Sequence, residues 1–207
     1  MKISNPLDRI LDNEAKIKIL RFLIKTGAQW NGRQIAKGVG VTPATSHKAL
    51  HGLYKEGVLI LQNVGKTHLY SLNSDNYVVS DLLNPLFAKE DRVLSDIVAM
   101  IKKSIISSSL KENIVSVVLF GSVNLRKDGP KSDIDLAVLV KDKESLRKAE
   151  NLFEGIDKKI SAEFGNTVSP YINSVAGFKT KRKKGLDIIK NILKSNTLIY
   201  GKEIEKI

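Results

Sequence analysis

Two aspartates separated by a single residue are the side chains of this sequence best suited to do chemistry. Asp133 and Asp135 lie in the segment SDIDLAVLV, where they open an apolar run that is typical of a buried strand. Because side chains of a strand alternate between its faces, both carboxylates project to the same side, about 7 Å apart along the chain. Mutual repulsion and desolvation oppose such a pair unless a cation binds it. We therefore predict a magnesium site that handles phosphate groups, since Mg²⁺ prefers carboxylates combined with substrate phosphates.

A glycine and a serine supply the second part of this predicted site. Gly121 and Ser122 directly follow the run IVSVVLF, which also predicts a buried strand. A glycine at the end of a strand lets backbone amides approach an anion closely, and a serine hydroxyl beside a helix N-terminus can hold a phosphate. A Gly-Ser pair alone carries no signal, so its meaning depends on the aspartates that follow.

The combined segment GSVNLRKDGPKSDIDLAV resembles the signature of the DNA polymerase beta type nucleotidyltransferase superfamily, and the minimal nucleotidyltransferases are closest in size. The resemblance covers residues 114–200 and implies a mixed sheet flanked by helices. It also implies that Gly121 and Ser122 bind the triphosphate of an NTP, while Asp133 and Asp135 hold two magnesium ions. In such two-ion sites one ion activates the attacking hydroxyl and the other steadies the leaving pyrophosphate.

The sequence departs from the family pattern in two places. Where relatives carry a third carboxylate, on the strand expected near residues 167–172, this chain has Ser169. A serine is no base near neutral pH, and the loss of a general base lowers a rate by about 10² to 10⁴. Glu163 is near in sequence, but the sequence does not place it in the site. The second departure is at Asn124, Leu125 and Arg126, where many relatives have Ala-Arg-Gly.

The first 72 residues have a different sequence pattern, with short helical segments followed by two β-prone runs. Apolar residues at helical spacing, with cap residues before them, predict three short helices over residues 13–26, 31–37 and 42–56. Gly38 and Gly40 predict a tight turn between the second and the third helix. Two β-prone runs, 58–63 and 67–72, predict a hairpin.

This order of elements, with the segment VTPATSHKALHGLYKEGVL, resembles the winged helix-turn-helix domain of transcriptional regulators, over about a third of the chain. In that family the third helix enters the major groove of DNA. The resemblance therefore implies a DNA-binding role for the matching positions of the third helix and the wing. These positions are Thr42, Ala44, Thr45, His47, Lys48, Lys66 and His68. The alternatives are solvated surface for single side chains, and a protein-interaction module for the domain.

Two further segments connect or follow these domains. A helical stretch over residues 78–106 has an apolar stripe that includes Ile97, Ile101 and Ile105, which either packs against a domain or forms a dimer seam. Near the end, FKTKRKKG concentrates basic residues ahead of a helix. Such a run is most often a solvated helix start, and phosphate contact is the alternative.

Composition narrows the function classes. The 34 Lys and Arg against 22 Asp and Glu give a net charge of +12, which favours nucleic acid or another anionic partner. The absence of cysteine excludes disulfides and thiol chemistry. We see neither a secretory signal nor a spanning helix, so we expect no membrane partner and a cytoplasmic location.

We thus expect an α+β chain with three parts: a winged helix-turn-helix domain at 1–77, a helical connector at 78–110 and a nucleotidyltransferase-like domain at 111–207. Three functions are compatible with it. The favoured one is a magnesium-dependent nucleotidyltransferase that moves a nucleoside monophosphate from an NTP to a hydroxyl acceptor, with DNA as a partner. The others are a DNA-binding regulator with a nucleotide-sensing domain, and an antitoxin-like protein-interaction component.

Overall fold

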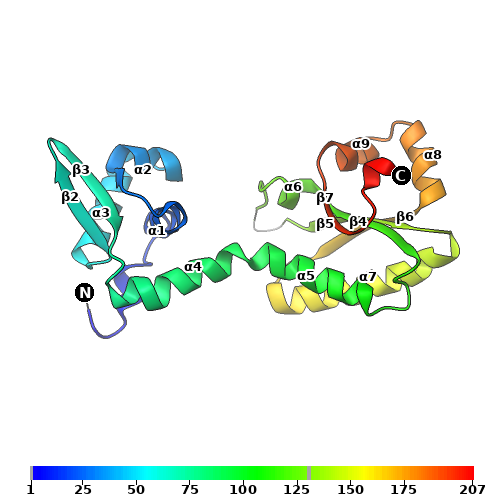
Figure 1. Ribbon diagram of the computed structural model, residues 1–207, viewed down its shortest axis with the longest axis horizontal. Coiled ribbons are helices and arrows are strands. Elements are labelled where there is room, and N and C mark those ends of the chain that lie inside the picture. Colours follow the sequence, from blue (N-terminus) through cyan, green and yellow to red (C-terminus); the bar gives the residue numbers. More distant parts are fainter. Residues whose placement is uncertain (1, 130–131) are drawn as a thin grey trace. The chain divides into compact units, whose positions relative to one another are not determined.

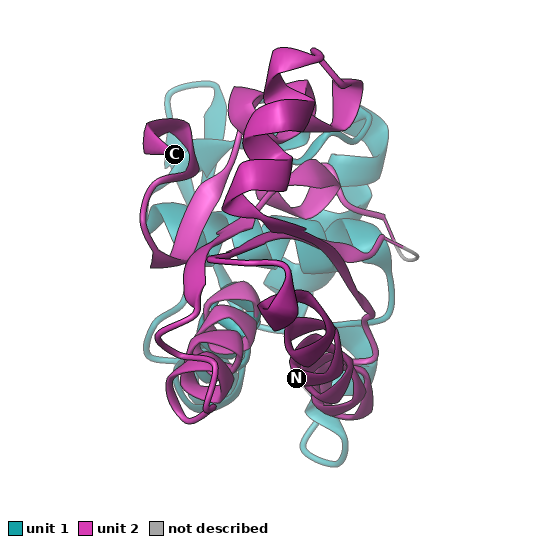
Figure 2. Ribbon diagram, turned by 90° about the vertical axis from the view of Figure 1, so that its right-hand side faces the viewer, with its two compact units in different colours: residues 1–93 teal, residues 94–207 magenta. Residues whose placement is uncertain are grey.

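The chain forms two compact units, each with a hydrophobic core of its own. The computed structural model describes residues 2–129 and 132–207, and the units comprise residues 1–93 and 94–207 (Figure 2). Their boundary falls inside segment 78–110, which we expected to be a connector, so that segment is shared between the units. Within the described residues, no helix is both long and apolar enough to cross a lipid bilayer.

Three helices form the core of the N-terminal unit, and cap residues in the sequence set their starts. Asn13, Asn31 and Thr42 each accept a hydrogen bond from a backbone amide in the first turn of the helix that follows. Gly27 and Gly40, with φ of 60° and 71°, end the first two helices in the left-handed region that glycine adopts freely. The helices are α1 (Glu14–Thr26), α2 (Gly32–Val39) and α3 (Pro43–Lys55), preceded by η1 (Pro6–Arg9).

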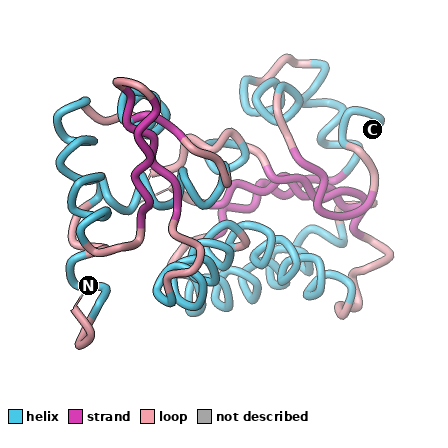
Figure 3. The backbone as a smooth tube through the Cα atoms, turned by 60° about the vertical axis from the view of Figure 1, so that its left-hand side comes forward, coloured by secondary structure: helices cyan, strands magenta, loops and turns pink. Residues whose placement is uncertain are grey.

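A small antiparallel sheet completes this unit. Its strands are β1 (Trp30–Asn31), β2 (Leu59–Val64) and β3 (Thr67–Leu72), in the order β1-β3-β2. The two-residue strand β1 was not predicted, since it is too short to show a β pattern. Three helices closed by the β2–β3 hairpin make this unit a winged helix-turn-helix domain, as expected (Figure 3).

Gly38 has a different role from the predicted one. It lies inside α2, where a Cβ would come within 2.7 Å of the Phe22 ring on α1. Close packing of two helices therefore requires this glycine, whereas Gly40 alone makes the turn.

The segment after the hairpin packs back onto the N-terminal core. It forms η2 (Val78–Leu83), a π-helical turn, and α4 (Asn84–Asp91). Leu83 and Phe87 are buried in that core. The Arg21 guanidinium on α1 donates hydrogen bonds of 2.6 and 2.7 Å to the Glu90 carboxylate. The first half of the expected connector is thus part of the N-terminal unit.

The C-terminal unit is built on a mixed four-stranded sheet in the order β6-β5-β4-β7 (Figure 1). Strand β5 pairs antiparallel with β4 and parallel with β6, and β7 pairs antiparallel with β4. The parallel pair requires a crossover, which α7 (Glu144–Phe164) provides. The strands are β4 (Ile114–Leu119), β5 (Ile134–Val140), β6 (Val168–Ser174) and β7 (Thr197–Gly201).

Helices cover both faces of this sheet. Leu136 and Val138 of β5 join a core with α5 (Val93–Ile106) and α7, while Ala137 and Leu139 join a second core on the opposite face. The second core includes residues of α8 (Val175–Lys183), α9 (Asp187–Lys194) and η3 (Ile204–Lys206). The mixed sheet flanked by helices agrees with the polymerase beta-like fold that the sequence implied.

The apolar stripe of α5 is explained by this packing. Ile97, Ile101 and Ile105 are at most 4% exposed and belong to the core that the sheet forms with α5 and α7. Of the two alternatives left by the sequence, the structure therefore shows the stripe packed against a domain.

Candidate functional site

The glycine and the aspartates of the motif meet at one end of the C-terminal sheet. Gly121 follows β4 and begins α6 (Gly121–Asn124), with φ of 78°. A Cβ on this residue would overlap a carboxylate oxygen of Asp135 and lie 2.9 Å from its Cγ. Only glycine fits here without displacing that carboxylate, so the two motif segments are in direct contact.

Asp133 and Asp135 lie together at the start of β5. Asp133 directly precedes the strand and is exposed, and Asp135, its second residue, is half-buried. Burial, followed by the negative charge of Asp133, raises the pKa of the Asp135 carboxyl. The Thr167 hydroxyl, at the start of the neighbouring strand, donates a hydrogen bond to the Asp133 carboxylate. These neighbours show that both carboxylates share one acidic corner.

At the position where a third carboxylate would complete this site, the chain carries hydroxyl groups. The parallel register pairs Asp135 with Ser169 on β6, the residue at which we expected the third carboxylate of relatives. Thr167, which we did not predict, is two residues before Ser169 and so projects to the same face of the sheet, where it lies beside Asp133. Glu163 lies on α7, on the other face of the sheet, where it lines a groove with residues of α5.

The residues of the second expected departure from the family pattern lie at the end of α6 and in the turn that follows it. The Asn124 side chain donates to Ser195 Oγ at 3.0 Å and accepts from Thr197 Oγ1 at 2.7 Å, which ties α6 to the start of β7. Arg126 has φ of 53°, a left-handed value that is unusual for a residue with a Cβ. Glycine, which the family resemblance led us to expect at this position, adopts that conformation freely.

The residues present fit a magnesium ion in part. Two carboxylates supply hard oxygen ligands on one side, and the missing side chain of Gly121 gives room to the carboxylate of Asp135. Among the described residues, however, no group of three or more potential metal-ligating side chains is found. A cation here would therefore depend on further oxygens from water or from a bound phosphate.

In the N-terminal unit, helix α3 presents the predicted DNA-contacting residues to solvent. Ala44, His47 and Lys48 are exposed, and the His47 ring lies parallel to that of His51, with centroids 6.4 Å apart. Thr42 has a structural task, because its Oγ1 accepts the Thr45 amide at 3.2 Å as the N-cap of α3.

A hollow of about 510 Å³ separates α3 from the hairpin. It brings together three of the predicted residues, His47, Lys66 and His68, and adds Arg33 from the first turn of α2. The His68 ring is hydrogen-bonded through Nδ1 to Asn63 Oδ1 at 2.6 Å. Arg33 was missed because the sequence places it next to a helix cap, with no sign that the hairpin lies opposite.

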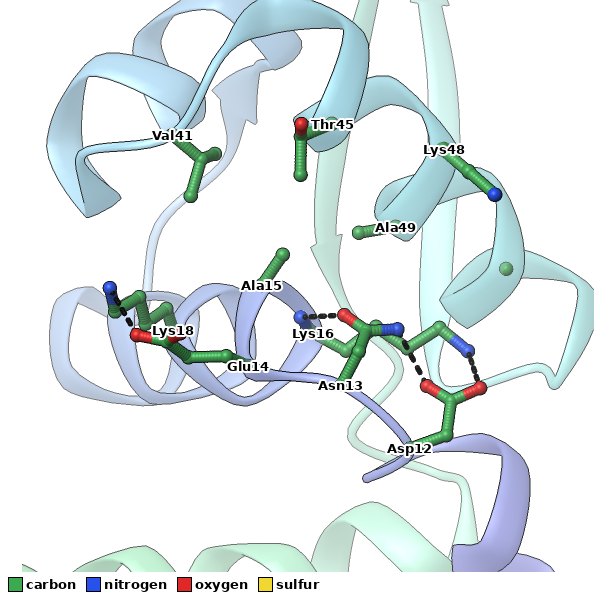
Figure 4. Close-up of a pocket in the computed structure, with 11 residues that line it drawn as sticks. Asp12, Asn13, Glu14, Ala15, Lys16, Lys18, Val41, Thr45, Lys48 and Ala49 are labelled. Carbon is green, nitrogen blue, oxygen red and sulfur yellow. Dashed lines mark hydrogen bonds and ion pairs between the residues drawn. The ribbon is translucent and has the colours of Figure 1, made fainter.

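A second hollow, of about 700 Å³, lies on the other side of α3, against the start of α1 (Figure 4). Thr45 and Lys48 line it from α3, and Lys16 and Lys18 line it from α1. The α1 lysines are neutralised locally, since Lys18 pairs with Glu14 at 2.6 Å and Lys16 pairs with an aspartate at 3.1 Å. The hairpin side of α3 is thus the side that holds Arg33 and Lys66, whereas Lys48, a predicted DNA contact, lies on the other side.

Comparison with known proteins identifies one of the two units. The family described as "Polymerase beta, Nucleotidyltransferase" matches residues 102–205, half of the chain. Among curated proteins, none matches this chain.

Similar solved structures cover only parts of the chain. The transcriptional repressor BigR from Xylella fastidiosa is 17% identical over 40% of this chain and 81% of its own, with a TM-score of 0.35. The homodimeric winged helix-turn-helix DNA-binding domain of Mycobacterium bovis Mb0332 is 20% identical over 44% and 81%, with a TM-score of 0.37. A toxin-antitoxin structure with AMP-PNP is 17% identical over 50% and 76%, with a TM-score of 0.30.

Likenesses of this size do not indicate a function. The sheet order, the contact between Gly121 and Asp135 and the family match over residues 102–205 all agree. The chain therefore belongs to the polymerase beta nucleotidyltransferase family, with a winged helix-turn-helix domain before the nucleotidyltransferase domain.

Proposed function

We propose that this protein is a magnesium-dependent nucleotidyltransferase that moves a nucleoside monophosphate from an NTP to a hydroxyl acceptor. The observation that carries the proposal is the contact between Gly121 and the half-buried Asp135, with Asp133 beside it. A pair of like charges at this point is unfavourable for a protein that never binds a cation. A cation with a phosphate ligand explains both the pair and the glycine.

Each residue has a distinct role in this proposal. Gly121 and Ser122 hold the triphosphate through backbone amides and the serine hydroxyl, and Asp133 and Asp135 hold Mg²⁺. Thr167 orients the Asp133 carboxylate through its hydrogen bond. When bound, Mg²⁺ neutralises negative charge on the phosphates. The acceptor oxygen forms a bond to the α-phosphorus, and the bond from that phosphorus to pyrophosphate breaks.

Proton removal from the acceptor is the weak step. Ser169 cannot accept the proton at neutral pH, so the acceptor must lose it to water or to one of the two aspartates. We therefore expect slow turnover, below that of a relative with a third carboxylate by about 10² to 10⁴.

Labelled nucleotides test this proposal. The full-length protein with Mg²⁺ and α-labelled NTPs should release pyrophosphate, and Asp133→Asn should abolish the release. Asp187→Asn is the matched control, because Asp187 has a side chain that is 92% exposed and pairs only locally with Lys190. Equal release by both variants would contradict the proposal.

Ser169 also favours a second candidate function, a DNA-binding regulator that senses a nucleotide without turnover. In that case NTP and Mg²⁺ bind, Asp133→Asn weakens the binding, and no pyrophosphate appears. Calorimetry on the same variants tests whether NTP and Mg²⁺ bind, and pyrophosphate release by a protein that binds them separates the two functions.

We further propose that the N-terminal unit binds DNA through the hairpin side of α3. Arg33 and Lys66 line the hollow at that side. The lysines of α1 line the other hollow and are paired with carboxylates. Each lost phosphate contact lowers the slope of log affinity against log salt by about 0.9. Lys66→Gln should therefore reduce that slope, whereas Lys18→Gln should leave it unchanged.

A further inference from the structure

The basic run after β6 contains one lysine that differs from the rest. Of Lys179, Lys181, Arg182, Lys183 and Lys184, only Lys181 is half-buried, and the others are exposed. The Lys181 ammonium donates a hydrogen bond of 3.0 Å to Asn173 Oδ1 and lies 5.1 Å from the centre of the Tyr171 ring. The run forms the last turns of α8 and not the expected helix start, and solvation explains its exposed members but not Lys181.

The partners of Lys181 in the described part of the chain carry no negative charge. Asn173 is a neutral amide, 8% exposed, and Tyr171 contributes the face of its ring. Within residues 2–129 and 132–207, the two other lysines that are not exposed are paired with carboxylates, Lys16 with Asp12 at 3.1 Å and Lys18 with Glu14 at 2.6 Å. A partly desolvated cation with neutral partners is suited to receive an anion.

This cluster lies on the same sheet face as the aspartates. Ser169, Tyr171 and Asn173 alternate along β6 and share one face, and their register partners on β5 are Asp135, Ala137 and Leu139. Helix α8, which carries Lys181, covers this face (Figure 1). The cluster therefore lies on the same face as the acidic corner, farther along β6.

The strand order separates this cluster from the triphosphate cradle. In the sheet order β6-β5-β4-β7, Gly121 at the end of β4 lies on one side of Asp135, and the β6 cluster lies on the other. A nucleotide held at Gly121 and Ser122 leaves the β6 side to the molecule that attacks it.

We propose that Lys181, Asn173 and Tyr171 form a subsite for an anionic group, a phosphate or a carboxylate, of the acceptor. The assignment to the acceptor rests on the proposed nucleotidyl transfer, whereas the anion site itself does not. From Ser169 to Asn173 the strand rises about 13 Å. The acceptor therefore carries its anionic group about that far from its reactive hydroxyl, which excludes simple hydroxy acids.

Nuclear magnetic resonance on the ¹⁵N-labelled full-length protein tests this subsite without any NTP. Inorganic phosphate, and separately acetate, is titrated at constant ionic strength while the side-chain amide of Asn173 and the backbone amide of Gly177 are followed. Saturable shifts with either anion support the subsite, and the tighter of the two identifies the group. Shifts that do not saturate, or that follow ionic strength alone, would overturn it.

Two matched variants show whether anion binding depends on Lys181 itself or only on the positive charge of α8. Lys181→Gln should weaken the binding by about tenfold or more, because a charge-assisted hydrogen bond is lost. Lys183→Gln removes the same charge from an exposed position of the same helix and should change the affinity less than twofold. Equal weakening by both variants would show general attraction and contradict the subsite.

A third variant guards against misfolding, and the readouts keep the two proposals apart. Lys181→Arg keeps the charge and should restore most of the affinity that Lys181→Gln loses. Phosphate binding at Lys181 in a protein without transferase activity would contradict only the proposed function. Transferase activity without anion binding at Lys181 would contradict only the subsite.

Discussion

At the scale of single residues, the acidic corner depends on three positions with different physical tasks. Gly121 provides space, Asp135 provides a charge that burial makes costly, and Ser169 leaves a position without a base. Each task predicts the outcome of one substitution.

Ser169→Asp should raise the rate of nucleotidyl transfer. The register places this side chain beside Asp135, so an added carboxylate completes the metal site and accepts the proton of the acceptor. We expect a gain of about 10² or more, measured as pyrophosphate release under saturating Mg²⁺. Ser169→Asn is the control of equal size, and a matching gain in that variant would contradict the general-base explanation.

Gly121→Ala should destabilise the C-terminal unit and abolish nucleotide binding. The left-handed backbone costs an alanine about 1 to 2 kcal/mol, and the added Cβ displaces the Asp135 carboxylate. Gly155→Ala, inside α7, is the opposite case, because nothing lies within 4 Å of its Cβ. It should stabilise the protein by about 0.5 to 1 kcal/mol. Denaturant unfolding of both variants checks the two signs.

Asp135→Asn should stabilise the magnesium-free protein near neutral pH. The pKa of Asp135 is raised from 3.8 by burial and by Asp133, so the folded state holds its proton more tightly than the unfolded chain. That contribution to stability is present below the ordinary pKa and is lost as the pH rises through the raised value. Asp135→Asn has no carboxyl group to ionise, so its stability does not fall in this pH range.

Thermal unfolding against pH measures the effect of Asp135→Asn. Solvent screening at a half-buried carboxyl keeps the gain in Tm below about 4 °C. The difference should vanish in acid, and Mg²⁺ should stabilise the natural protein more than the variant. A variant that is less stable than the natural protein without Mg²⁺ would contradict the charge argument.

At the scale of elements, Asn124 ties a short helix to a distant strand. Helix α6 has four residues and cannot hold its own shape, so its position depends on the bonds to Ser195 and Thr197. Asn124→Ala should cost about 1 to 2 kcal/mol of unfolding free energy and weaken NTP binding. Ser195→Ala removes one of the two bonds and should have a smaller effect on both quantities. Calorimetric NTP titrations and denaturant curves provide the comparison.

The elements also show what the sequence could predict. Caps such as Asn31, together with the apolar runs, predicted the three N-terminal helices, the hairpin and β4 and β5 within a few residues, because these signals are local. Of the short helix α6 only a helix N-terminus beside Ser122 was expected, and the strand β7 was not predicted. The stability of both elements comes from partners far along the chain. The same limit hid Arg33 and Thr167, whose roles arise from strands that approach them.

At the scale of the whole molecule, the two separate cores predict two unfolding transitions. Each unit buries its own apolar residues, and the predicted ligands also belong to different units. Differential scanning calorimetry with Mg²⁺ and NTP should raise the transition of the C-terminal unit only, by about 2.7 kcal/mol at a hundred times Kd. Addition of duplex DNA should raise the other. A single transition that both ligands shift equally would contradict independent units.

The left-handed backbone at Arg126 has a consequence for how this sequence can change. Every arginine codon becomes a glycine codon by one base substitution, whereas no serine codon becomes an aspartate or glutamate codon in a single step. Random mutagenesis at a low error rate will therefore sample glycine at position 126 readily, and an acidic residue at Ser169 only rarely. Selection for faster turnover should therefore yield glycine at position 126 long before it yields an acidic residue in place of Ser169.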